Sequence, residues 1–151
     1  VAERADVGIR SVFRHFDDMD DIFETANEII FQDTRPLFVG GDRSGTLDVR
    51  IMHCTEQLTA GYESVKNFML SGRIRIWNTP IIQKNYTLNS KRLQKELENW
   101  IPEILELAEC DKQCAYAQAS FDFWYRLRKG QQVAEADCIE IIARQLRQLF
   151  P

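Results

Sequence analysis

Apolar residues recur along most of the chain at the three- and four-residue spacing of an amphipathic helix. In residues 9–16, Ile9, Val12, Phe13 and Phe16 fall on one helical face. Comparable stripes run through residues 20–34, 46–60, 64–77, 80–109, 111–128 and 134–149. The alternating runs typical of strands are nearly absent, and no Asn-Gly or Asp-Gly hairpin signal occurs. We therefore predict an all-α fold.

Glycine and proline predict where these helices begin and end. Residues 39–45 contain three glycines and form the clearest loop, and Gly61 is expected to separate two helices. The pair Thr79-Pro80 is typical of an N-cap followed by the first helical residue. Pro102 should kink or split the long helix that starts there.

The composition predicts a protein with an apolar core and a charged, hydrated surface. Hydrophobic residues make up 44% of the chain and charged residues 28%. No apolar run approaches the ~18 residues that cross a bilayer, and the first residues do not resemble a signal peptide. We therefore expect a cytoplasmic protein without a membrane partner.

Metal, cofactor and enzyme chemistry find little support in the residues. The four cysteines form neither a zinc pattern nor a C-x-x-C redox pair, and the chain has only two histidines. No phosphate-binding loop, nucleophile elbow or H-E-x-x-H motif occurs. We expect no metal site and no cofactor, and a helical enzyme is the least favoured interpretation.

The first 23 residues have the pattern of a helix, a short turn and a second short helix. The turn falls at residues 6–8, and the second helix, residues 9–16, opposes its apolar face with Arg10, Ser11, Arg14 and His15. Residues 1–16 carry three arginines against two acidic residues, although the whole chain has a net charge of −4. A helix-turn-helix that reads DNA has such a second helix, but spacing alone also allows an ordinary helical hairpin.

The order of residue types in this segment resembles the DNA-reading motif of the tetracycline-repressor (TetR) family of transcriptional regulators. That motif is roughly A-x-x-A-G-V-S-x-x-T-L-Y-x-H-F-x-S-K-x-x-L. The resemblance covers about the first 23 residues; the remainder is similar only in its series of helices. Direct matches are Ala2, Ala5, Val7, His15 and Phe16, and conservative replacements are Ser11, Val12, Phe13 and Ile22.

The resemblance implies a ligand-responsive DNA-binding regulator, expected to be a repressor, that acts as a homodimer on a palindromic double-stranded DNA operator. It divides the chain into a partial helix-turn-helix module with a connecting helix, residues 1–34, and a helical ligand-binding and dimerisation domain, residues 35–151. It also implies further helices before residue 1. The expected DNA-binding residues are Gly8, Ile9, Arg10, Ser11, Phe13, Arg14 and His15.

Several departures from the motif favour an alternative. Phe13 replaces a tyrosine and Met19 replaces a lysine, both of which commonly contact phosphates in the family. Four aspartates, at positions 17, 18, 20 and 21, add negative charge close to the expected DNA backbone. Because phosphate contacts supply much of the affinity for DNA, the alternative is a TetR-like module that binds a small molecule or a protein, with weak or lost DNA binding.

The resemblance also places an effector cavity and a dimer interface in the helical body. The effector should be small and largely apolar, and candidate lining residues are Trp77, Tyr86, Trp100, Phe121 and Trp124. The dimer should form through two helices, residues 111–128 and 134–149, which carry surplus apolar residues. The candidate interface anchors are Phe123, Ile142 and Leu146.

Overall fold

Helices account for the regular structure of this protein. The computed structural model describes residues 19–73, 76 and 78–150. Over these residues the elements are α2 (Met19–Val39), α3 (Leu47–Arg73), α4 (Pro80–Trp100), the 3-10 helix η1 (Pro102–Glu106), α5 (Glu109–Gln118), α6 (Phe121–Tyr125), the π-helical turn η2 (Arg126–Gly130) and α7 (Glu135–Arg147). No strand occurs in this part of the chain, so the predicted all-α class is confirmed there.

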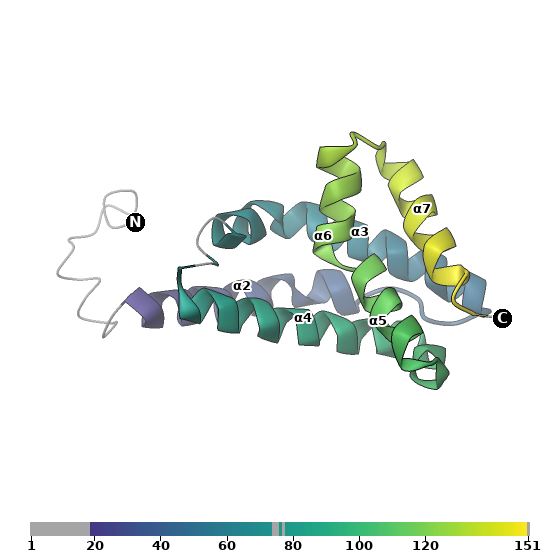
Figure 1. Ribbon diagram of the computed structural model, residues 1–151, viewed down its shortest axis with the longest axis horizontal. Coiled ribbons are helices and arrows are strands. Elements are labelled where there is room, and N and C mark those ends of the chain that lie inside the picture. The colour runs from purple at the N-terminus through teal and green to yellow at the C-terminus, as the bar shows by residue number, and fades with distance from the viewer. Residues whose placement is uncertain (1–18, 74–75, 77, 151) are drawn as a thin grey trace.

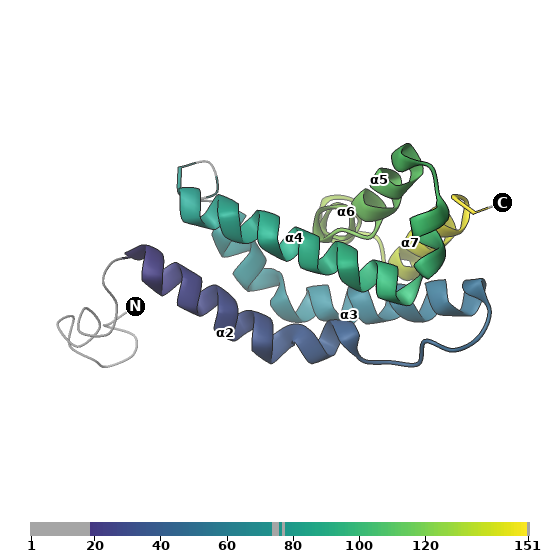
Figure 2. The ribbon, with the colours of Figure 1, turned by 90° about the horizontal axis from the view of Figure 1, so that it is seen from below.

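The described helices form two groups, one of three long helices and one of shorter helices. Figures 1 and 2 show α2, α3 and α4 running along its length, with α5, α6 and α7 gathered towards the half that holds the C-terminus. α3 packs against α2, α4 and α7, and α2 also packs against α4. The helix α3 is therefore the central element, because it packs against helices of both groups. None of the described helices combines the length and the apolar character needed to cross a bilayer.

A threonine precedes the first residue of both α3 and α4. Thr46 precedes α3, and its Oγ1 accepts a hydrogen bond from the Val49 N–H at 3.4 Å. Thr79 is the N-cap of α4, and Pro80 is its first residue. Gly41 and Gly45 have φ values of +99° and +100°, a left-handed backbone that glycine adopts without strain. Residues 40–46 therefore form a loop, which confirms the loop predicted at residues 39–45 except at Val39, which belongs to α2.

Two predicted helix boundaries are wrong, for different reasons. Gly61 does not separate two helices, because it lies inside the continuous α3 where the ring of Phe38 packs directly against its Cα. The helix predicted over residues 20–34 continues through Pro36 to Val39.

Pro102 splits the predicted helix of residues 80–109, as expected: α4 ends at Trp100, and the five residues from Pro102 form a separate 3-10 helix. The helix predicted over residues 111–128 breaks after Gln118. There Ser120 begins α6 by accepting a hydrogen bond from the Phe123 N–H at 3.3 Å.

The core lies where α3 meets α5, α6 and α7. Its largest side chains, Tyr62, Trp100 and Trp124, are at most 2% exposed. The Tyr62 hydroxyl donates a hydrogen bond to the Ala119 carbonyl at 2.5 Å, and burial raises the pKa of this phenol. Tyr62, Phe121 and Trp124 form an aromatic cluster with ring centroids 5.4 to 5.7 Å apart. This cluster fixes α6 against the middle of α3.

Candidate ligand-binding cavity

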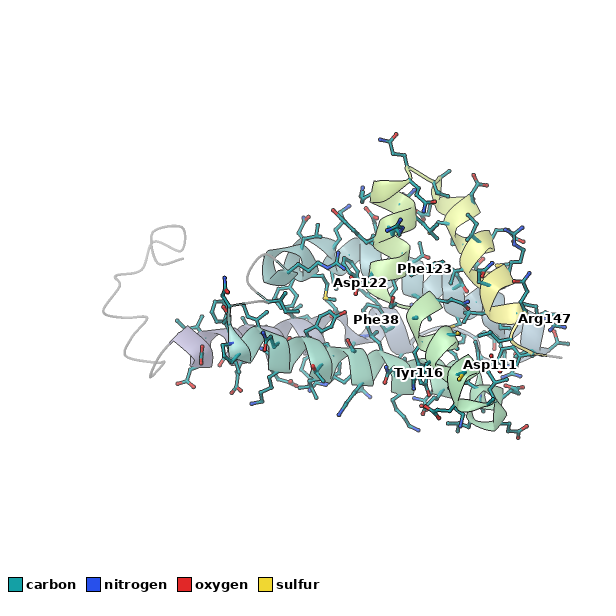
Figure 3. All side chains as sticks on the ribbon, in the orientation of Figure 1. Phe38, Asp111, Tyr116, Asp122, Phe123 and Arg147 are labelled. Atoms are coloured by element: carbon teal, nitrogen blue, oxygen red, sulfur yellow. The ribbon has the colours of Figure 1, made fainter. Side chains whose placement is uncertain are left out.

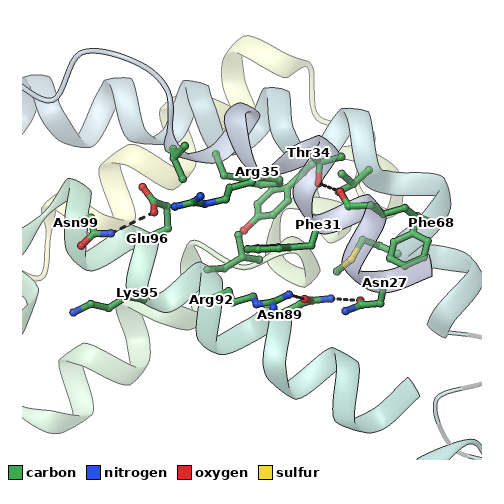
Figure 4. Close-up of a pocket in the computed structure, with 17 residues that line it drawn as sticks. Asn27, Phe31, Thr34, Arg35, Phe68, Asn89, Arg92, Lys95, Glu96 and Asn99 are labelled. Carbon is green, nitrogen blue, oxygen red and sulfur yellow. Dashed lines mark hydrogen bonds between the residues drawn. The ribbon is translucent and has the colours of Figure 1, made fainter. Parts of the chain in front are cut away.

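A cavity of about 290 Å³ opens where α2, α3 and α4 converge (Figure 4). Its apolar and aromatic wall consists of Ile30, Phe31, Phe38, Val39, Tyr62, Val65, Phe68, Met69 and Leu93. Its polar lining comes mainly from α2 and α4 and comprises Asn27, Thr34, Arg35, Asn89, Arg92, Lys95, Glu96 and Asn99. A mostly apolar hollow with a few placed polar groups is the usual form of a small-molecule site.

One face of α2 supplies a whole wall of this cavity. Its seven lining residues occupy positions 27, 30, 31, 34, 35, 38 and 39, the spacing of a single helical face. Polar Asn27 and Thr34 interrupt the apolar part of this stripe, and Arg35 lies at its exposed margin. The Thr34 hydroxyl donates to the Ile30 carbonyl at 2.6 Å, and the Asn27 side chain is only 5% exposed. Polar groups on a buried stripe are the signal by which the sequence could have indicated this site.

Paired side chains tie α2 to α4 beside the cavity. The Asn89 amide donates to Asn27 Oδ1 at 2.7 Å. The Arg92 guanidinium lies 3.7 Å from the ring centroid of Phe31 and donates to Glu28 Oε2 at 3.0 Å. Hydrogen bonds from Gln32 and Arg92 lower the pKa of the Glu28 carboxyl. The two helices are therefore joined by polar contacts at the site and not by apolar packing alone.

The end of the cavity nearest the α2–α3 loop carries an ionic cluster. Glu96 forms an ion pair with Arg43 and accepts a hydrogen bond from the Asn99 amide at 3.3 Å. The Arg43 guanidinium also lies 4.7 Å from the ring centroid of Trp100 and donates to the Val39 carbonyl at 2.5 Å. These contacts connect the end of α2 with α4.

The four predicted ligand-binding residues that the structure describes do not line this cavity. Trp100 and Trp124 are buried in the core, and the Trp100 indole N–H donates to the Phe38 carbonyl at 3.3 Å. Tyr86 and Phe121 line a second hollow of about 290 Å³ between α4, α5 and α6. There the Tyr86 hydroxyl donates to Asp122 Oδ2 at 2.7 Å, and Asp122 also pairs with Arg73. Trp77 lies outside the described residues. The two described tryptophans therefore belong to the core, whereas phenylalanines line the cavity.

The remaining predicted site residues divide into two groups. All the expected DNA-binding residues, Gly8 to His15, lie outside the described residues. Of the expected interface anchors, Ile142 is 3% exposed and Leu146 0%, so both belong to the core of their own chain. Phe123 is only half-buried and packs at the edge of this core.

Metal-ligand side chains do not gather in the described part of the chain. No group of three or more His, Cys, Asp or Glu residues there could hold a metal ion. Cys54 and Cys138 are buried, and desolvation raises the pKa of both thiols. Cys110 and Cys114 are exposed on α5.

Comparisons with known proteins add no neighbour to this picture. A scan of the chain against protein-family models found no match, and neither did the searches of curated proteins and of solved structures.

Proposed function

We propose that this protein is a homodimeric, ligand-responsive transcriptional regulator of the TetR type, in which occupation of the α2–α3–α4 cavity alters DNA binding. The observation that carries the proposal is the double role of α2. This helix comes directly after the expected reading helix, residues 9–16, and it gives seven residues of one face to the cavity wall. A ligand there touches the element that joins the cavity to the proposed DNA-reading helix.

Coupling requires a ligand that prefers one position of α2 over another. A ligand with equal affinity for both positions shifts no equilibrium, however tightly it binds. The contacts between α2 and α4 supply a place for such a preference. The pairs Asn27–Asn89 and Glu28–Arg92 both join these helices at the cavity, so a ligand that alters either pair moves α2 relative to α4.

DNA recognition is assigned to the second helix of the motif. Arg10 and Arg14 lie off its apolar face, and their forked donors match guanine edges and phosphates. In a two-fold dimer, two such helices enter successive major grooves, which predicts a palindrome with half-sites ~34–36 Å apart.

The test is titration of the full-length natural protein against a selected operator at two salt concentrations. The variants are Arg10→Ala and Arg14→Ala. If the replaced arginine reads a base, its loss should cost ~1–3 kcal/mol of binding free energy and relax specificity at one position. If it contacts a phosphate, its loss should weaken binding to all sequences alike and reduce the slope of affinity against salt concentration by about one. The control is Arg126→Ala, an exposed arginine on η2 with the same change of charge. If both motif variants bind as the control does, DNA reading by this helix is wrong.

The alternative, a TetR-like binding module without operator binding, is favoured by acidic residues near the motif. Asp20 and Asp21 occupy the first turn of α2, directly after the expected reading helix. Carboxylates there repel a phosphate backbone. The same titration separates the two functions, because the alternative predicts no sequence preference at either salt concentration while ligand binding in the cavity persists.

A further inference from the structure

The cavity is lined by more positive than negative charge. The lining contains three cationic side chains, Arg35, Arg92 and Lys95, and one carboxylate, Glu96. Three of these four groups already have a partner of opposite charge outside the cavity lining: Arg92 pairs with Glu28, Lys95 with Glu98, and Glu96 with Arg43. Their charges are therefore balanced before any ligand enters.

Arg35 is the exception. Its guanidinium makes no hydrogen bond or ion pair with any residue in the described ranges, and its side chain is exposed at the margin of the cavity. Figure 4 shows it extending from α2 toward Glu96, whose carboxylate is already held by Arg43 and Asn99. The lining thus retains one positive charge without a direct partner.

The Asn27 amide on the same wall can donate to a ligand. Its Oδ1 atom accepts from Asn89, and no described residue accepts from its Nδ2 group. Asn27 is 5% exposed and lines the cavity, so an acceptor on a ligand would have a donor there. The Thr34 hydroxyl has given its hydrogen to the Ile30 carbonyl.

We propose that the cavity binds a small, monoanionic, amphipathic molecule whose acid group pairs with Arg35 and whose apolar body lies against Phe31, Phe68 and Met69. One unbalanced positive charge selects one negative charge, and its exposed position keeps the acid group near water. The apolar wall takes the rest of the molecule. This inference rests on the proposed ligand-sensing function and narrows the expected largely apolar effector to an acid.

Two fluorescent probes of nearly the same shape test the proposal. 1-Anilinonaphthalene-8-sulfonate carries one negative charge, and N-phenyl-1-naphthylamine is its neutral counterpart without the sulfonate. Each is titrated against wild-type protein, Arg35→Gln and Lys91→Gln, with folding checked by circular dichroism. Lys91 is exposed on α4, lies outside the cavity lining and loses the same charge on substitution. Arg35→Gln should weaken the anionic probe about tenfold and leave the neutral probe unchanged, whereas Lys91→Gln should change neither.

A further variant locates the probes. Ile30→Trp places a large ring in the cavity from a half-buried position on α2, and it should weaken both probes. If both probes bind Ile30→Trp as they bind wild type, they occupy another site and the proposal is overturned. If Ile30→Trp weakens both but Arg35→Gln affects them equally, the acid specificity is wrong while the ligand-sensing function stands. If neither probe binds wild type, the ligand-sensing function loses its cavity as well.

Discussion

At the scale of single residues, Arg50 shows how one side chain joins distant parts of the chain. It lies on α3 with its side chain 15% exposed, and it pairs with Glu103 in η1. It also donates to the Trp100 carbonyl at the end of α4, at 3.2 Å. The hydrogen bond from Arg50 lowers the pKa of the Glu103 carboxyl below its ordinary value of 4.5. The pair therefore contributes stability only while Glu103 is ionised.

We expect Arg50→Met to lower the free energy of unfolding by about 1 kcal/mol at pH 7, since Glu103 is more than a third exposed and partly screened. A depressed folded pKa gives stability that is present above pH 4.5 and lost as pH falls through the folded pKa. The difference between wild type and variant should shrink below pH 4 without vanishing, because the bond to Trp100 persists. Urea unfolding at pH 7 and pH 3.5 measures it, with Lys91→Met as control. An equal difference at both pH values would contradict the pairing.

At the scale of helices, Gly61 allows α2 and α3 to approach closely. A Cβ added at this position would lie 2.6 Å from Cε1 and 2.7 Å from Cζ of Phe38, well inside normal contact. Gly72 near the end of the same helix has only Ile82 nearby, at 3.8 Å. The two glycines therefore offer a matched pair within one element.

We predict opposite effects of alanine at these two positions. Gly72→Ala should raise the free energy of unfolding by up to about 1 kcal/mol, because alanine favours a helix. Gly61→Ala should lower it by about 1–3 kcal/mol, because the Phe38 ring must shift. Chemical denaturation measures both, and the double variant Gly61→Ala/Phe38→Leu should recover part of the loss. If Gly61→Ala were as stable as Gly72→Ala, close approach would not be the reason for this glycine.

The same position explains why the sequence predicted the helices better than their limits. Apolar spacing is a local property, and it located α2, α3, α4 and α7 along the chain. Gly61 resembles a helix break locally, and only its contact with Phe38, 23 positions away, shows the reason for it. Likewise, the break between α5 and α6 depends on Ser120, which serves as a new N-cap and which the apolar stripe does not indicate.

At the scale of the whole molecule, the cavity was harder to predict than the core. The expected lining residues were large aromatics, and Trp100, Phe121 and Trp124 instead belong to the buried core around α3. The observed lining depends on how α2 lies against α3 and α4, which is a long-range property. Phe38, which lines the cavity, lies near the middle of the molecule in Figure 3, whereas Arg147 lies at the end of α7. A list of apolar residues does not distinguish a packed interior from a hollow.

Dimerisation of the whole molecule stays a prediction. Because two of the three expected anchors are buried in their own chain, other substitutions are needed to test it. Ile142 and Leu146 are buried in their own chain, so Leu146→Ala should lower the free energy of unfolding by about 2–5 kcal/mol. Phe123 keeps part of its surface, as do Ile139 on α7 and Leu149 just after this helix. The two expected interface segments of each protomer, residues 111–128 and 134–149, would together form a four-helix bundle that buries on the order of 2,000 Å².

We expect a dimeric mass by light scattering at micromolar concentration, and a shift toward monomer for Phe123→Asp, because a charge buried in that interface has no partner. The matched control is Leu105→Asp. Leu105 is an apolar residue in η1 that is 53% exposed, so its replacement should leave the mass unchanged. Circular dichroism separates dissociation from unfolding, since Phe123→Asp should keep its helical signal. A monomeric wild type would refute the dimer, and an unchanged mass for Phe123→Asp would move the interface away from α6.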